Sequence, residues 1–130
     1  MKINALTGIS AAVIAELKKG KPRTIELQSA HNIITLIDVL PGDHIFMTEI
    51  NEDDLSVGDP GIVVNVISVS IGMKRMTEYA PLHYCEEKER MTARVKVQYV
   101  DKTSAKCVEG CDWEKPTIVD VIRSSVYHAG

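Results

Sequence analysis

One short segment, GKPRTIELQ (residues 20–28), carries side chains of the types and spacing that a ligand site needs. Basic, hydroxyl, acidic and amide groups alternate there with aliphatic ones. Ammonium and guanidinium groups bind anions, and the other polar groups donate or accept hydrogen bonds that orient a ligand. The alternative is that they form only the solvated face of a strand. The predicted ligand-binding residues are Lys21, Arg23, Thr24, Glu26 and Gln28.

Two predicted elements position this segment, a helix before it and a strand within it. Ser10 is a suitable N-cap for a helix that runs to about Lys19, where apolar residues recur at helical spacing. Gly20 is placed to end that helix, and Pro22 prevents its continuation. Residues 23–28 then alternate apolar and polar side chains, which predicts a strand. His31 and Asn32, which follow, are interpreted as turn or capping residues.

The first half of the chain also contains strands separated by turns. Residues 2–6 are compatible with a strand, and residues 44–48 follow a Pro-Gly-Asp turn as another. Residues 32–40 are apolar at nearly every position, so periodicity leaves a short helix and a strand equally open. An acidic, turn-rich connection over residues 49–61 separates two strands.

The second half is predicted to be mostly β. Residues 62–71 are rich in β-branched side chains and apolar on both faces, so they are expected deep in a sheet. Residues 72–90 are polar and contain Pro81, which predicts a loop, with a helical turn or charged loop from residue 85. Residues 92–100 alternate as a strand with its charged positions outward. Residues 116–127 are open between helix and strand, and their β-branched content favours the strand.

These elements predict the fold class. One or two helices among five or six strands indicate a mainly β, α+β protein. A small β-barrel with the N-terminal helix packed against it suits this pattern, because closing a sheet removes its exposed edges. At 130 residues the chain is expected to form a single domain over residues 1–130.

Composition limits the function classes. Apolar residues make up 45% and charged residues 25% of the chain, a globular balance, and no apolar run spans a bilayer. The N-terminus has no export-signal pattern, so a cytoplasmic location is expected. The formal charge of −3 argues against a large nucleic-acid footprint, so any such contact needs a local basic patch. Tyr79, Tyr84 and Trp113 are the candidates for stacking on bases.

The cysteines do not predict a metal site. Cys107 and Cys111 have a C-x3-C spacing, but the other candidate ligands, His83 and Cys85, are remote in sequence from them. The odd number of cysteines also argues against a disulfide framework. We expect reduced thiols, no metal site and no cofactor.

The segments GKPRTIEL (20–27), LPGDHIFM (40–47) and GDPGIVVNVISV (58–69), preceded by a helix, resemble the ASCH domains of the PUA superfamily. This resemblance covers roughly residues 5 to 71. Over nearly its whole length the chain also resembles a family of archaeal proteins of unknown function. The residues that carry the second resemblance are ALTGIS (5–10), RTIEL (23–27), the Gly-Asp-x-Ile-Phe stretch (42–46) and DLSVGDPGIVV (54–64).

The PUA resemblance implies a barrel-like fold with a cleft between the first helix and the sheet, which relatives use for RNA, modified nucleosides or other ligands. The basic, hydroxyl and acidic positions of the ASCH pattern fall on Lys21, Thr24 and Glu26. Gln28 stands where many ASCH domains have an arginine, so a neutral amide replaces a guanidinium that binds anions.

Three functional hypotheses follow. The first is a PUA-like module that binds RNA or a nucleotide in a cleft beside the 20–28 strand. The second, also implied by the resemblance, is a small amidohydrolase acting on a modified nucleoside, with Lys21 and Thr24 as its catalytic residues. Burial would lower the pKa of the lysine so that it activates the threonine hydroxyl. The third is a protein-interaction subunit with no small-molecule site.

Overall fold

The computed structural model describes residues 2–79, 85–109 and 116–121, with the backbone alone for residues 73–79, 85–90, 107 and 109. Two helices and six strands form within these ranges, so the chain is mainly β with an α+β architecture, as predicted. Their order is β1 (Lys2–Leu6), α1 (Ala11–Leu17), β2 (Arg23–Leu27), α2 (Ala30–Leu36), β3 (His44–Met47), β4 (Pro60–Tyr79), β5 (Cys85–Glu109) and β6 (Ile118–Val121).

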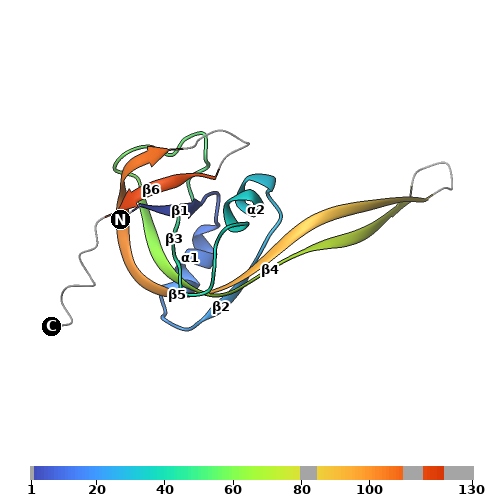
Figure 1. Cartoon of the computed structure of the whole chain (residues 1–130), viewed down its shortest axis with the longest axis horizontal. Coiled ribbons are helices and arrows are strands. Elements are labelled where there is room, and N and C mark those ends of the chain that lie inside the picture. Colours follow the sequence, from blue (N-terminus) through green and yellow to red (C-terminus); the bar gives the residue numbers. More distant parts are fainter. Residues whose placement is uncertain (1, 80–84, 110–115, 122–130) are drawn as a thin grey trace.

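The six strands form one sheet in the order β2-β5-β4-β3-β1-β6, and β5 pairs with β6 as well (Figure 1). All pairings are antiparallel except that of β1 with β3. The pairings β5-β4-β3-β1-β6 therefore return to β5 in a closed circuit. Strand β2 lies outside this circuit and pairs only with residues 93–97 of β5 among the described strands.

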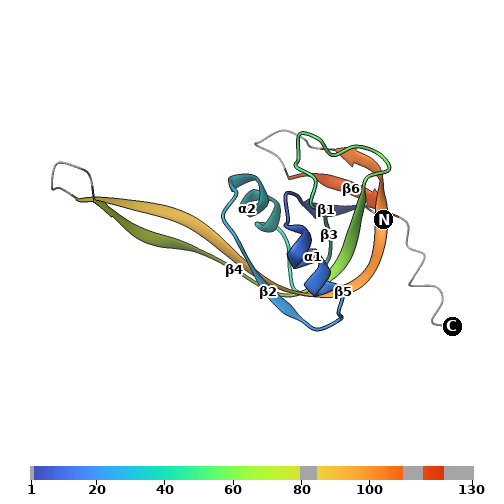
Figure 2. The same cartoon turned by 180° about the vertical axis from the view of Figure 1, so that it is seen from behind.

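Strands β4 and β5 extend far beyond the rest of the sheet as a two-stranded arm (Figures 1 and 2). We define the arm as residues 72–79 and 85–92, which pair continuously from Gly72 opposite Thr92 to Tyr79 opposite Cys85. The predicted loop is therefore wrong for residues 72–79 and 85–90, and so is the helical turn or charged loop from residue 85. Residues 80–84, the remainder of the predicted loop, lie outside the described residues. Cross-strand hydrogen bonds satisfy the backbone of the arm without the apolar alternation that a half-buried strand displays.

Both helices begin at a serine N-cap. Ser10 Oγ accepts a hydrogen bond from the Val13 backbone N–H at 3.2 Å, and Gly20, with a φ of 91°, follows the end of α1. The helix ends at Leu17, two residues before the predicted end. Ser29 Oγ accepts from the Asn32 N–H at the start of α2, so residues 32–36 of the ambiguous 32–40 segment are helical. In the tail, residues 118–121 are the favoured strand, and residues 122–127 lie outside the described residues.

Two clusters of buried apolar side chains stabilise the sheet, one on each face of β3 and β4. In β3, Ile45 and Met47 belong to the larger cluster, which α1 and α2 cover, whereas Phe46 belongs to the smaller one. In β4, Ile62 and Val64 face the larger cluster and Val63 the smaller. This burial on both sides confirms the prediction for the beginning of the 62–71 segment.

A buried amide joins α2 to the end of β1. Asn32 Oδ1 accepts a hydrogen bond from the Thr7 N–H at 3.0 Å, and Asn32 Nδ2 donates to the Thr7 carbonyl at 2.9 Å. The neighbouring His31 is also buried, with Nε2 2.7 Å from Thr117 Oγ1. The interpretation of these two residues as turn or capping residues is wrong, because both lie within α2 and contact distant parts of the chain.

Gly61 on β4 packs against Phe46 and Met47 of β3, and replacing it by alanine tests this packing. A Cβ at Gly61 would overlap the Phe46 ring and the Met47 carbonyl oxygen. We expect Gly61→Ala to lower the free energy of unfolding by about 1–3 kcal/mol, as for other overpacked cores. Gly72→Ala is the control, since nothing lies within 4 Å of its added Cβ. Urea denaturation compares the two variants, and equal unfolding midpoints would contradict the described packing.

Replacing Asn32 by alanine tests the link between α2 and β1. The change leaves a buried N–H and a buried C=O of Thr7 without partners, which costs about 2–4 kcal/mol of unfolding free energy. Asn65→Ala, at a partly exposed position on β4, is the matched control and is expected to change stability by less than about 1 kcal/mol. Thermal denaturation measures both, and an Asn32→Ala variant as stable as the control would show that the amide bonds are not important for stability.

Candidate functional site

The five predicted ligand-binding residues are all exposed on and around β2. Thr24 and Glu26 lie on the outward face of the strand, while Ile25 and Leu27 are buried on the other. This burial confirms the predicted alternation. Lys21 precedes the strand and Gln28 follows it, and both residues are exposed as well.

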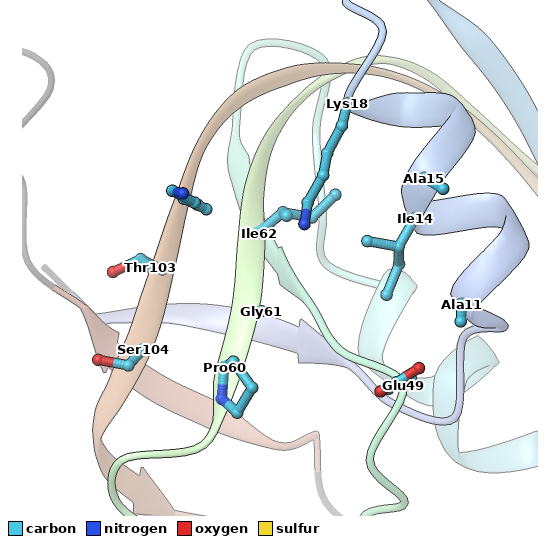
Figure 3. A pocket seen from close by; sticks show the side chains of 11 residues that line it. Ala11, Ile14, Ala15, Lys18, Glu49, Pro60, Gly61, Ile62, Thr103 and Ser104 are labelled. Atoms are coloured by element: carbon cyan, nitrogen blue, oxygen red, sulfur yellow. The ribbon is translucent and has the colours of Figure 1, made fainter.

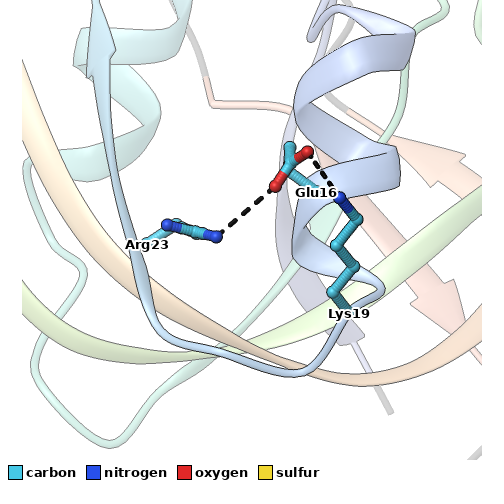
Figure 4. Close-up of polar contacts among 3 residues, drawn as sticks. All are labelled: Glu16, Lys19 and Arg23. Carbon is cyan, nitrogen blue, oxygen red and sulfur yellow. Dashed lines mark hydrogen bonds and ion pairs between the residues drawn. The ribbon is translucent and has the colours of Figure 1, made fainter.

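Arg23, the remaining member of this set, already has an anionic partner. Its guanidinium lies 3.4 Å from a Glu16 carboxylate oxygen, and the Lys19 ammonium lies 2.8 Å from the other oxygen (Figure 4). The Lys19 hydrogen bond and charge, with a smaller contribution from Arg23, lower the pKa of Glu16 below its usual value. Glu16 therefore stays ionised at neutral pH and competes with any external anion for Arg23.

Strand β5 places cations beside the outward face of β2. Thr24 is opposite Lys96 and Glu26 is opposite Arg94 in the strand register. Arg94 Nη2 lies 3.8 Å from Glu26 Oε2, and its side chain remains 66% exposed. The sequence predicts these β5 side chains to face outward but gives no sign that they lie next to β2, about 70 residues earlier in the chain.

A pocket of about 580 Å³ lies between α1 and the sheet, at the end of the β4–β5 ladder opposite the arm (Figure 3). Lys18 and Glu49 lie at opposite ends of this space in the close-up. Lys102 of β5 is the second lysine among the lining residues. The lining residues are Ala11, Ile14, Ala15, Lys18, Glu49, Pro60, Gly61, Ile62, Lys102, Thr103 and Ser104.

The geometry of α1 explains how the helix contributes to this pocket. Ala11, Ile14, Ala15 and Lys18 are spaced i, i+3, i+4 and i+7, so they share one face of the helix. The small alanine side chains leave space between that face and β4. None of the five residues predicted as ligand-binding lines the pocket. The sequence does not point to the residues that do line it, because alanine has no functional group that indicates a binding site. The spacing of Ala11, Ala15 and Lys18 was the available clue.

A second, more polar pocket of about 520 Å³ lies beside β1 and the turn before β3, where Asp38 and Lys2 contribute charges.

Among the described residues, no group of three His, Cys, Asp or Glu side chains is placed to hold a metal ion. The side chains of several residues that the sequence offered as metal ligands or stacking groups are not described. Cys85, Cys107 and Tyr79 are described by their backbone only, and the others, His83, Tyr84, Cys111 and Trp113, lie outside the described ranges. Neither described helix has the length and apolar character needed to span a membrane.

Comparison with known proteins identifies relatives but no activity. No solved structure matches the chain. Over 109 residues the chain is 30% identical to "Uncharacterized protein MJ0105" from Methanocaldococcus jannaschii, a match that covers 84% of this chain and 66% of the relative. A family described as "Protein of unknown function (DUF473)" matches residues 1–119. The chain therefore belongs to the DUF473 family, which confirms the resemblance to an archaeal family of unknown function.

Proposed function

We propose that the chain is a PUA-like module that binds a nucleotide, or one nucleotide of an RNA, in the pocket between α1 and the sheet. The observation that carries this proposal is the pair of lysines, Lys18 at the C-cap of α1 and Lys102 on β5, that line this pocket together with largely apolar residues. A closed circuit of strand pairings with a helix against it supports a PUA-like barrel, since the resemblance implies this arrangement. The resemblance also implies a cleft in this place.

The pocket has the size and the chemistry for a nucleotide. Its volume of about 580 Å³ lies within the usual range of roughly 300–1,000 Å³ for small-molecule sites. Ile14, Pro60 and Ile62 offer an apolar surface for a base. Lys18 and Lys102 attract a phosphate, and Glu49 accepts hydrogen bonds from a base N–H or a ribose hydroxyl.

In the proposed site the ligand lies on the helix side of the sheet, and not on the outward face of β2, where the sequence places the candidate residues. On β2, the predicted cations are partly committed, because Arg23 pairs with Glu16. Lys21, Thr24, Glu26 and Gln28 are exposed side chains that line neither of the two pockets. A concave site surrounds more of a small ligand than an exposed strand does, so the pocket is the better candidate.

The amidohydrolase hypothesis gains no support from the described geometry. It requires a buried lysine close to the threonine hydroxyl and a carboxylate, but Lys21 and Thr24 are both exposed. No hydrogen bond between described atoms joins them. The protein-interaction hypothesis stays a prediction.

Replacing the two pocket lysines tests the proposed site. We expect Lys18→Ala and Lys102→Ala each to weaken binding of a nucleoside monophosphate by about tenfold, because each removes one charge-assisted contact of about 1.4 kcal/mol. Isothermal titration calorimetry with the four common ribonucleoside monophosphates measures the effect. The same variants are compared for binding of a short single-stranded RNA.

Lys21→Ala is the matched control, since it removes the same charge from an exposed lysine that does not line the pocket. The proposal expects it to bind nucleotide within about twofold of the unmodified protein. Loss of binding in Lys21→Ala, with Lys18→Ala unaffected, would place the ligand on β2. Failure of the unmodified protein to bind both nucleotides and RNA would contradict the proposed function.

A further inference from the structure

The chain has a formal net charge of −3, but the register of β4 with β5 places most of the basic residues of these strands on one face. From Ser68 opposite Lys96 onward, pairing is regular and without a register shift to Tyr79 opposite Cys85. Alternate residues of each strand therefore belong to the same face throughout this stretch. The residues beside β2 show which face is outward: Arg94, Lys96 and Ser70 are exposed, whereas Ala93 and Val95 are buried.

The outward face extends from the body of the protein onto the arm and is basic over most of its length. The register places five basic positions on it and no acidic position in β4 residues 68–76 or β5 residues 88–96. We call this set of positions the basic face. Its cationic members are Lys74, Lys88, Arg90, Arg94 and Lys96.

Acidic residues lie at the borders of this face or on the opposite one. Glu87 and Glu89 belong to the opposite set, where Glu89 is opposite Arg75 in the strand register. Glu78 and Glu86 face each other in the register near the end of the arm and limit the basic face there. Glu26 on β2 borders it at the other end, 3.8 Å from Arg94.

We infer that the basic face binds duplex DNA, with the part of this face that lies on the arm in the major groove. A two-stranded β-ribbon fits the major groove of B-form DNA, which is about 12 Å wide. The basic face spans eight residue steps, roughly 26 Å at the usual rise of a strand. Its outer half, residues 72–76 opposite residues 88–92, belongs to the two-stranded arm, whereas in the inner half residues 93–97 of β5 also pair with β2. Because only one face is basic, only one face of the ribbon is suited to approach the DNA phosphates.

The residues between the cations favour a duplex over a single strand. They are small or aliphatic, namely Ser68, Ser70, Gly72, Thr92 and Met76, so this face offers no aromatic ring on which a base could stack. The two serines and the threonine supply hydroxyl groups for phosphate contacts. Duplex RNA fits less well, because the A-form major groove is too narrow and deep for side chains to enter.

This interface is distinct from the nucleotide pocket and does not depend on it. The pocket is formed by residues 60–62 of β4 and 102–104 of β5, at one end of the ladder, whereas the arm lies at the other end. Loss of Lys18 or Lys102 is therefore expected to leave DNA binding by the arm intact. The two proposals can fail separately.

Fluorescence anisotropy of a labelled duplex DNA of about 20 base pairs, titrated with the full chain at several salt concentrations, tests this inference. We expect Arg90→Ala to weaken binding by about tenfold at about 50 mM salt and to reduce the slope of log K against log salt by about 1. Lys74→Ala, which changes the position opposite residue 90, is expected to have the same effect.

Arg75→Ala is the matched control, because it removes an arginine from the same arm but from the opposite face. It is expected to bind DNA within about twofold of the unmodified chain. Equal losses in Arg75→Ala and Arg90→Ala would overturn the assignment to one face, and no salt-dependent DNA binding by the unmodified chain would overturn the interface. Tighter binding to duplex RNA or to single-stranded DNA of the same sequence would overturn the choice of duplex DNA.

Discussion

The antiparallel pairing of β4 with β5 is the interaction on which the rest of this structure depends. Strand β5 also pairs with β2 and β6, so it connects the edge strand, the closed circuit of pairings and the arm. Two register shifts interrupt the ladder, where Val100 and Ile67 are the extra residues. Because side chains alternate with a period of two, each extra residue exchanges the faces of its strand beyond that point.

The shift at Ile67 has a direct consequence for the arm. Before it, Val66 is buried; after it, Val69 packs against the same core while Ser68 and Ser70 are exposed. Without the extra residue, the β4 positions that now share the basic face would belong to the core-facing set. The single unpaired residue Ile67 therefore allows β4 to be buried in the body and to carry a charged face on the arm. The pocket, at the far end of the ladder, is not affected by this shift.

Much of the body of the protein could be predicted from sequence, because local signals and burial agree there. Ser10 and Gly20 bound the first helix, and the alternation at Ile25 and Leu27 identifies β2. The arm could not be predicted in this way, since its pairing depends on a partner strand rather than on apolar periodicity. Asn32 was misinterpreted for a related reason: its partner, Thr7, is 25 residues away.

For the candidate sites, too, the sequence predicts local features but not those that depend on distant residues. The polar alternation of β2 correctly predicts which side chains are exposed, but exposure alone does not make a concave site. The pocket depends on small side chains of α1 and on residues from both ends of the sequence, which only the fold brings together. The basic face likewise depends on cross-strand register, because the cations and acidic residues of the arm are interspersed along the chain.

The most direct test of the basic face is to determine the register of the arm in solution. NMR on the isotopically labelled full chain gives this register from cross-strand backbone contacts. We expect contacts between residues 74 and 90 and between residues 76 and 88, in phase with the pairing of Ser70 and Arg94. A slip that places residue 74 opposite residue 89 would bring acidic positions onto the basic face. That result, or an end to cross-strand contacts beyond Gly72, would show that the arm does not have the described register and that the basic face does not form.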